Sequence, residues 1–99
     1  MRENRGPMPD KVEETWFVYL LECTNGKIYT GIAKDVEKRF QRHASGKGAK
    51  FTKRNPPVRI LAHKKCKNRS EASQLERAIK ALKAAQKRDL GVEWISSSL

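Results

Sequence analysis

Five residues of this sequence carry groups that could act together on a phosphate ester: two phenols, a guanidinium, an imidazole and a carboxylate. They are Tyr19, Tyr29, Arg39, His43 and Glu76. A guanidinium can bind phosphate oxygens in pairs, an imidazole can take up a proton near neutral pH, and a carboxylate can hold a hard divalent cation. Such chemistry requires a fold that brings three distant parts of the chain together.

The two tyrosines flank a predicted hairpin. Two runs rich in β-branched and aromatic residues surround Asn25-Gly26, a strong hairpin signal. A two-residue turn would place the tyrosines on opposite faces of the sheet. A three-residue loop with Gly26 in the left-handed region places Tyr19 opposite Gly31, and both rings on one face. We predict the three-residue loop because it also gathers the apolar side chains Val18, Leu20, Ile28 and Ile32 on the other face.

The other three groups lie beside the apolar stripes of predicted helices. Arg39 and His43 are four residues apart, so they share one face of a helix. Glu76 follows Leu75 at the edge of the stripe on a later helix. Taken alone, Arg39 could be a surface residue, His43 a histidine with satisfied hydrogen bonds at the edge of the core, and Glu76 the partner of Lys80 one turn away. Taken together and in this order, they favour a shared site.

The net charge of +11 is concentrated in one third of the chain. Residues 38–70 contain twelve Lys or Arg and no Asp or Glu, whereas the remaining residues hold ten basic and eleven acidic side chains. A continuous positive surface is typical of proteins that bind a polyanion. Nucleic acid is therefore the expected partner. A membrane surface is disfavoured because glycines and prolines interrupt the stretch.

A chain of 99 residues predicts one small domain. We expect residues 1–15 to form a disordered lead, residues 16–90 the folded domain and residues 91–99 a C-terminal tail. No apolar run approaches the ~20 residues of a membrane helix, and no signal peptide is evident, so a cytoplasmic location is expected. Cys23 and Cys66 belong to no CxxC pattern and are interpreted as small semi-buried apolar residues on strands rather than as a disulfide or a zinc site.

The predicted elements follow the order β-β-α-β-α. Strands at about 16–23 and 27–33 precede a helix at about 36–44, which Asp35 caps and Gly46 terminates. A third strand at about 58–66 precedes a helix at about 69–88, capped by Asn68 and closed by Gly91, after which Val92, Trp94 and Ile95 could fold back on the core. This order predicts a small α/β (α+β) domain with helices packed on a sheet.

The basic loop 46–54 is a candidate nucleic-acid contact. It combines four cations with an aromatic residue: Lys47, Lys50, Phe51, Lys53 and Arg54. Cations beside an exposed aromatic ring suit phosphates and a stacked base. Phe51 could equally plug the core, and the sequence leaves both alternatives open.

The ordered set of motifs resembles the GIY-YIG nuclease superfamily. It comprises Val18-Tyr19-Leu20, Tyr29-Thr30-Gly31 ten residues later, Arg39 with His43, and Glu76 on the last helix. The runs beginning at Tyr29 and at Gly46 are similar to the small stand-alone, single-domain bacterial members. The resemblance covers about residues 16–90. The first glycine of the family's first motif is absent here, and Thr30 replaces an isoleucine in the second.

This resemblance implies a three-stranded antiparallel sheet flanked by helices, and metal-dependent cleavage of a DNA phosphodiester. It implies Tyr19 and Tyr29 as site tyrosines, Arg39 and His43 as catalytic residues, and Glu76 as ligand of one Mg²⁺ or Mn²⁺ ion. The chemistry of these groups agrees, since a guanidinium can hold the charge that develops on phosphate. Tyr29 and His43 both stay open as the base.

The resulting hypothesis is a metal-dependent DNA endonuclease acting in repair, recombination or processing of single-stranded or branched DNA, with no small-molecule cofactor. The alternative is a non-catalytic basic nucleic-acid-binding protein. A third hypothesis, an interaction module, is supported only by two apolar residues that look exposed, Trp94 and Ile95. Glu76 favours the enzyme, because a carboxylate in a basic cleft repels phosphate unless it holds a metal ion.

Overall fold

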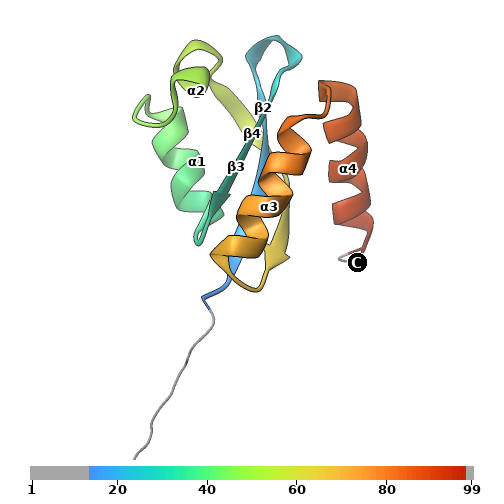
Figure 1. Cartoon of the computed structure of the whole chain (residues 1–99). Helices are drawn as coiled ribbons and strands as arrows, with labels where there is room; N and C mark the ends of the chain where they lie inside the picture. The colour runs from blue at the N-terminus through green and yellow to red at the C-terminus, as the bar shows by residue number, and fades with distance from the viewer. Residues whose placement is uncertain (1–13, 98–99) are drawn as a thin grey trace, which may run out of the picture.

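The computed structural model describes residues 14–97, which form a three-stranded antiparallel sheet with helices on both faces (Figure 1). The strands lie in the order β3-β2-β4. In chain order the elements are β2 (Trp16–Cys23), the turn η1 (Thr24–Gly26), β3 (Ile28–Ala33), α1 (Val36–Ala44), α2 (Lys50–Arg54), β4 (Pro57–Cys66), α3 (Arg69–Lys80) and α4 (Ala84–Ser97). The α+β class and the antiparallel sheet are confirmed. The predicted lead falls almost wholly on residues 1–13, which lie outside the described residues.

The hairpin between β2 and β3 has the predicted three-residue loop. The amide of Cys23 donates to the carbonyl of Lys27 at 2.7 Å, and Gly26 has a φ of 73°. Tyr19 pairs with Gly31 and Leu21 with Tyr29, so both tyrosines lie on one face of the sheet. Asn25 is also left-handed, with a φ of 66°, which the sequence did not indicate.

Each face of the sheet has its own core. On one face, Val18, Leu20 and Ile28 pack against buried residues of α3 and α4, such as Ile79 and Trp94. On the other face, Tyr19, Leu21 and Cys23 pack against Val36 of α1, with Phe40 beside them. Figure 1 shows α1 and α2 on one side of the sheet and α3 and α4 on the other. The two tyrosines therefore lie under α1.

The helix α1 begins and ends where predicted. The carboxylate of Asp35 accepts a hydrogen bond from the amide of Lys38 at 3.0 Å, and Gly46 follows the helix with a φ of 81°. The predicted loop 46–54 is partly wrong, because residues 50–54 form the short helix α2. That turn closes when the carbonyl of Ala49 accepts both the amide of Lys53 and the hydroxyl of Thr52.

The predicted single helix at 69–88 is wrong, because the chain turns between α3 and α4. A straight helix of that length would extend about 30 Å and leave the core. The turn instead lets Leu82, Leu90 and Trp94 pack on the core that α3 already covers. Gly91 does not end a helix but lies buried inside α4, where an added Cβ would meet Leu61 and Ala62 at 3.5 Å. Residues 91–97 therefore belong to α4 rather than to a tail.

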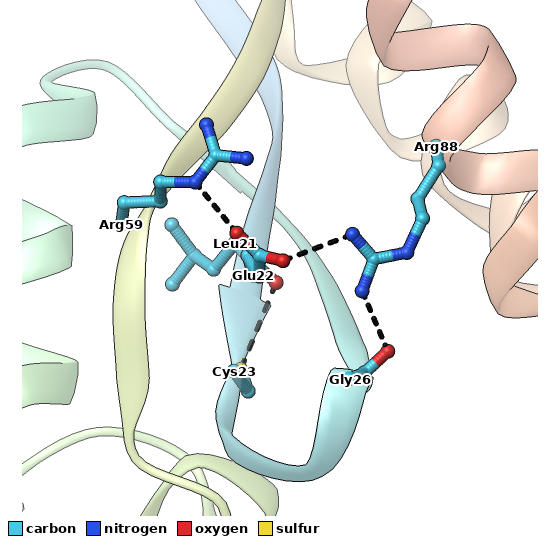
Figure 2. A network of polar contacts seen from close by, with 6 residues as sticks. All are labelled: Leu21, Glu22, Cys23, Gly26, Arg59 and Arg88. Atoms are coloured by element: carbon cyan, nitrogen blue, oxygen red, sulfur yellow. Dashed lines mark hydrogen bonds and ion pairs between the residues drawn. The ribbon is translucent and has the colours of Figure 1, made fainter.

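A carboxylate on β2 ties α4 and β4 to the hairpin (Figure 2). Glu22 accepts from Arg59 of β4 at 2.6 Å and from Arg88 of α4 at 2.9 Å. Arg88 also donates to the carbonyl of Gly26 at 2.9 Å. The Arg88 and Arg59 hydrogen bonds lower the pKa of Glu22 below its ordinary value. Among residues 14–97, no helix is long and apolar enough to cross a membrane.

Candidate active site

Tyr19, Tyr29 and His43 come together beneath α1, as the sequence predicts. The phenol oxygen of Tyr19 lies 2.9 Å from Nε2 of His43, and both side chains are almost fully buried. The ring centroids of Tyr29 and His43 are 4.9 Å apart, and those of the two tyrosines 6.3 Å. Tyr29 is only half-buried, so it is the phenol of this cluster that reaches solvent.

The hydrogen bonds around His43 fix where its proton lies. Nδ1 of His43 is 2.9 Å from the hydroxyl of Thr52, which is itself 2.9 Å from the carbonyl of Ala49. Two oxygens at that distance need a proton between them, so the Thr52 hydroxyl donates to Ala49 and accepts from Nδ1. A neutral His43 then has an unprotonated Nε2, which accepts from the Tyr19 phenol.

Burial keeps this arrangement in its neutral form. Burial, followed by the nearby charges of Arg39 and Arg42, lowers the pKa of His43 below its ordinary value. Burial also raises the pKa of Tyr19 to about 12, although a hydrogen bond from Arg39 acts in the opposite direction. A chain of hydrogen bonds therefore runs from Tyr19 through His43 and Thr52 to the carbonyl of Ala49, with the charged side chain of Arg39 close to the Tyr19 phenol.

Two glycines make room for these rings. A Cβ on Gly31 would lie 2.5 Å from Cζ of Tyr19, and a Cβ on Gly48 would lie 2.8 Å from Cε1 of His43. Such contacts are too short for any side chain, and both rings are held by hydrogen bonds. Gly31 and Gly48 are therefore required by the site, and not by a turn conformation.

Arg39 has an unused hydrogen-bond donor. Its Nε is buried and has no acceptor among residues 14–97. A buried donor of this kind is uncommon, and it lies on a group suited to bind an anion. The placement of Arg39 next to Tyr19 agrees with the sequence prediction.

Glu76 is only partly where it was expected. A metal ligand should direct its carboxylate into the basic cleft, but Oε2 of Glu76 lies 3.3 Å from Nζ of Lys80, the pairing that the sequence offered as the alternative. Glu76 nevertheless contributes to the raised pKa of Tyr19, so its charge acts on the same site. Its helix α3 contacts the edge strand β3 that carries Tyr29. Within residues 14–97, no three His, Cys, Asp or Glu side chains cluster to hold a metal ion by themselves.

The basic segment after α1 borders the site. The side chain of Phe51 is 37% exposed, and its ring centroid lies 5.9 Å from that of Tyr29, so Phe51 does not plug the core. Lys50, Phe51 and Arg54 line a cleft of about 470 Å³ together with Lys27. The exposed cations of this segment are Lys47, Lys50, Lys53 and Arg54.

Sequence reasoning missed the roles of Thr52 and Gly48, and it placed Gly31 opposite Tyr19 without predicting that the tyrosine ring lies over it. No periodicity marks a hydroxyl in a five-residue helix, and a glycine in a strand or loop gives no hint of the ring that will lie over it. The signal that could have identified Gly48 and Thr52 is their position in the sequence, because both lie within the basic segment 46–54.

Comparisons with known proteins identify the family to which this chain is related. The GIY-YIG catalytic domain matches residues 15–89. A UPF0213 protein of Cupriavidus pinatubonensis is 50% identical over 76 residues, which cover 77% of this chain and 84% of that protein. A UPF0213 protein of Desulfotalea psychrophila is 41% identical over 83 residues, covering 83% of this chain and 76% of the relative.

One solved structure supports the fold directly. The solution NMR structure of an E. faecalis protein has a TM-score of 0.54 and 36% sequence identity, covering 79% of this chain and 83% of that one. The family points to nuclease-type chemistry on DNA, which suits a buried Tyr-His pair beside an arginine. Together, the matched residues and the shared fold show that this chain belongs to the GIY-YIG catalytic domain family.

Proposed function

We propose that this protein is a metal-dependent endonuclease that hydrolyses phosphodiester bonds in single-stranded or branched DNA. The observation that carries the proposal is the half-buried side chain of Arg39 beside Tyr19, whose buried Nε–H has no acceptor among residues 14–97. A phosphate group would satisfy that donor, and the fixed positive charge would stabilise the charge that develops as water attacks.

The arrangement around His43 assigns different tasks to the two phenols. Both ring nitrogens of His43 are occupied, and its side chain is 1% exposed, so it does not contact the attacking water directly. Tyr29 reaches solvent and is the group that can accept a proton from water. Tyr19 and His43 instead hold Arg39 in position.

The residues present fit one divalent cation. Mg²⁺ commonly uses one or two carboxylates and completes its shell with waters and substrate phosphate, so Glu76 alone is a sufficient protein ligand. When bound, the ion would polarise the phosphate and lower the pKa of a bound water. Glu76 would have to exchange its contact with Lys80 for the ion.

That contact is also the observation that favours the alternative, a non-catalytic nucleic-acid-binding protein. An ion pair with Lys80, one turn away on the same helix, gives Glu76 a role that needs no metal ion. The two functions differ in what Arg39 does. For the enzyme it stabilises the transition state, whereas for the binder it is one phosphate contact among many.

The test incubates the full chain with labelled single-stranded, duplex and branched DNA, with Mg²⁺ or Mn²⁺ and with a chelator. We expect nicking that the chelator abolishes. Arg39→Ala should reduce cleavage by about 10²- to 10³-fold and weaken binding far less. Arg77→Ala, an exposed change on α3, is the matched control and should do neither. Equal losses of cleavage and binding in Arg39→Ala would favour the binder.

A further inference from the structure

A cleft of about 530 Å³ opens beside Arg39, where the end of β3 meets the N-terminal ends of α1 and α3. Five cations and one carboxylate line it: Lys34, Lys38, Arg39, Arg42, Arg69 and Asp35. Its residues differ from those of the basic segment 46–54, and only Arg39 belongs to the site described above. The cleft is therefore a second positively charged site adjoining the first.

The positive charge of the cleft is largely uncompensated. The carboxylate of Asp35 already caps α1 by accepting from the amide of Lys38. Lys34 pairs with Glu14 at 2.8 Å. In the described part of the chain, the other four cations have no carboxylate within 4.0 Å. Like charges held together in this way repel one another unless an anion binds between them.

Arg69 is placed where helix stability alone would not put it. It is the first residue of α3, and the partial positive charge of a helix N-terminus disfavours a cation there. Its guanidinium lies 5.5 Å from the ring centroid of Trp16, and the Lys34 ammonium lies 5.7 Å from it. The half-buried Trp16 ring therefore positions two cations at the rim of the cleft.

The size of the cleft suggests what occupies it. A volume of about 530 Å³ is in the range of pockets that hold a small organic group, and it exceeds what a lone ion needs. A DNA duplex is stiff over a few base pairs, so a nucleotide that stays paired and stacked within it cannot enter such a cleft. A nucleotide of an unpaired strand can enter the cleft, because its backbone is flexible and its phosphates can contact several cations.

We propose that this cleft binds one unpaired nucleotide of the substrate strand, next to the phosphodiester held at Arg39. Arg69, Lys38 and Arg42 contact its phosphate, and Trp16 lies at the rim where the nucleotide enters. The proposal rests on the proposed function in that it takes DNA as the substrate. It adds the position of a neighbouring unpaired nucleotide and the residues that bind it.

The test measures binding of a fluorescent twelve-nucleotide oligothymidine by anisotropy in chelator, at several salt concentrations. Arg69→Gln should weaken binding by about tenfold and reduce the slope of log K against log salt by about 0.7, the value for one lost phosphate contact on a single strand. Arg77→Gln removes the same charge from the other end of α3, outside the cleft, and should change affinity less than about twofold.

Fluorescence gives a second readout. Oligothymidine should quench the tryptophan emission of the wild-type protein, and Trp16→Phe should abolish that quenching while the buried Trp94 still emits. Equal effects of Arg69→Gln and Arg77→Gln would overturn the proposal. So would a duplex of equal length that suffers the same Arg69→Gln penalty, or polyglutamate that competes as well as oligothymidine.

The experiment tests the endonuclease proposal and the cleft proposal independently of each other. If the wild-type protein cuts no DNA but Arg69→Gln selectively weakens single-strand binding, the endonuclease proposal is wrong and the nucleotide cleft stands. If the protein cuts and Arg69→Gln binds like Arg77→Gln, the cleft proposal is wrong and the endonuclease stands. Thermal unfolding of each variant verifies that the fold is retained.

Discussion

The phenol oxygen of Tyr19 lies 2.9 Å from Nε2 of His43, although 24 residues separate the two in the sequence. Because Thr52 accepts from the other ring nitrogen, the imidazole is held as the Nδ1–H tautomer and Tyr19 is the donor. This direction matters for function, since it leaves the lone pairs of the Tyr19 oxygen free to accept from Arg39. The buried pair therefore presents an acceptor to the guanidinium of Arg39.

Thr52→Val should loosen this chain of hydrogen bonds. Valine has nearly the same shape but no hydroxyl, so Nδ1–H of the buried His43 loses its acceptor, at a cost of about 1–3 kcal/mol. We expect a lower free energy of unfolding in urea and slower cleavage. Thr52→Ser keeps the hydroxyl and should recover most of both. If Val and Ser behave alike, the hydroxyl does not position His43.

Gly31→Ala should displace the Tyr19 ring. The added Cβ would lie 2.5 Å from Cζ of Tyr19, so the ring must move and its hydrogen bond to His43 must lengthen. We expect a changed near-ultraviolet circular dichroism signal and a lower melting temperature. Gly91→Ala is the control, because its Cβ makes ordinary contacts at 3.5 Å inside α4 and should be neutral or stabilising. Matching losses in the two variants would contradict the argument.

Glu76→Gln should separate catalysis from binding. The amide keeps the shape but loses the charge that a hard cation needs, so cleavage should disappear. Binding of DNA without metal should stay level or tighten, because one negative charge has left a basic surface. Lys80→Gln removes the same ion pair but keeps the carboxylate, so it should retain cleavage. A Glu76→Gln protein that cuts as well as its parent would rule out the proposed ligand.

The basic segment after α1 should supply sequence-independent affinity. Replacing Lys47, Lys50 and Lys53 together by Gln should weaken binding to unrelated DNA sequences and reduce the salt slope by about two, because each lost phosphate contact on a single strand contributes about 0.7. The control removes the same charge from exposed positions on and just after β4, at Lys64, Lys65 and Lys67. Equal losses of affinity in the two triple variants would show that the binding surface extends over the whole basic stretch.

Glu22→Gln should remove part of the acid sensitivity of folding. Arg88 and Arg59 lower the folded-state pKa of Glu22, so its stabilisation is present above the ordinary glutamate pKa of about 4.3 and is lost as the pH falls through the lower folded value. The melting temperatures of wild type and variant should therefore differ at pH 7 and converge as the pH falls below the ordinary glutamate pKa. Glu93→Gln, an exposed change on α4, should show no such convergence.

Local signals in the sequence determined the parts of this protein that depend on neighbouring residues. Asn25-Gly26 specified the hairpin, and the apolar side chains of the two strands specified the register that puts both tyrosines on one face. Asp35 specified the start of α1, and helical spacing placed Arg39 and His43 side by side. The turn between α3 and α4 could not be predicted, because it is decided by the position of the core that Leu82 and Trp94 must reach.

Only the tertiary structure decided which partner each polar group takes. Glu76 has two possible partners, Lys80 one turn away and the tyrosine site across the edge of the sheet. The sequence does not determine which of the two lies closer to the carboxylate. Thr52 contacts His43 because α2 packs against α1. Arg69 lines the same cleft as Arg39 because α3 begins beside the end of β3. Contacts of this kind join residues far apart in the chain, so no local periodicity encodes them.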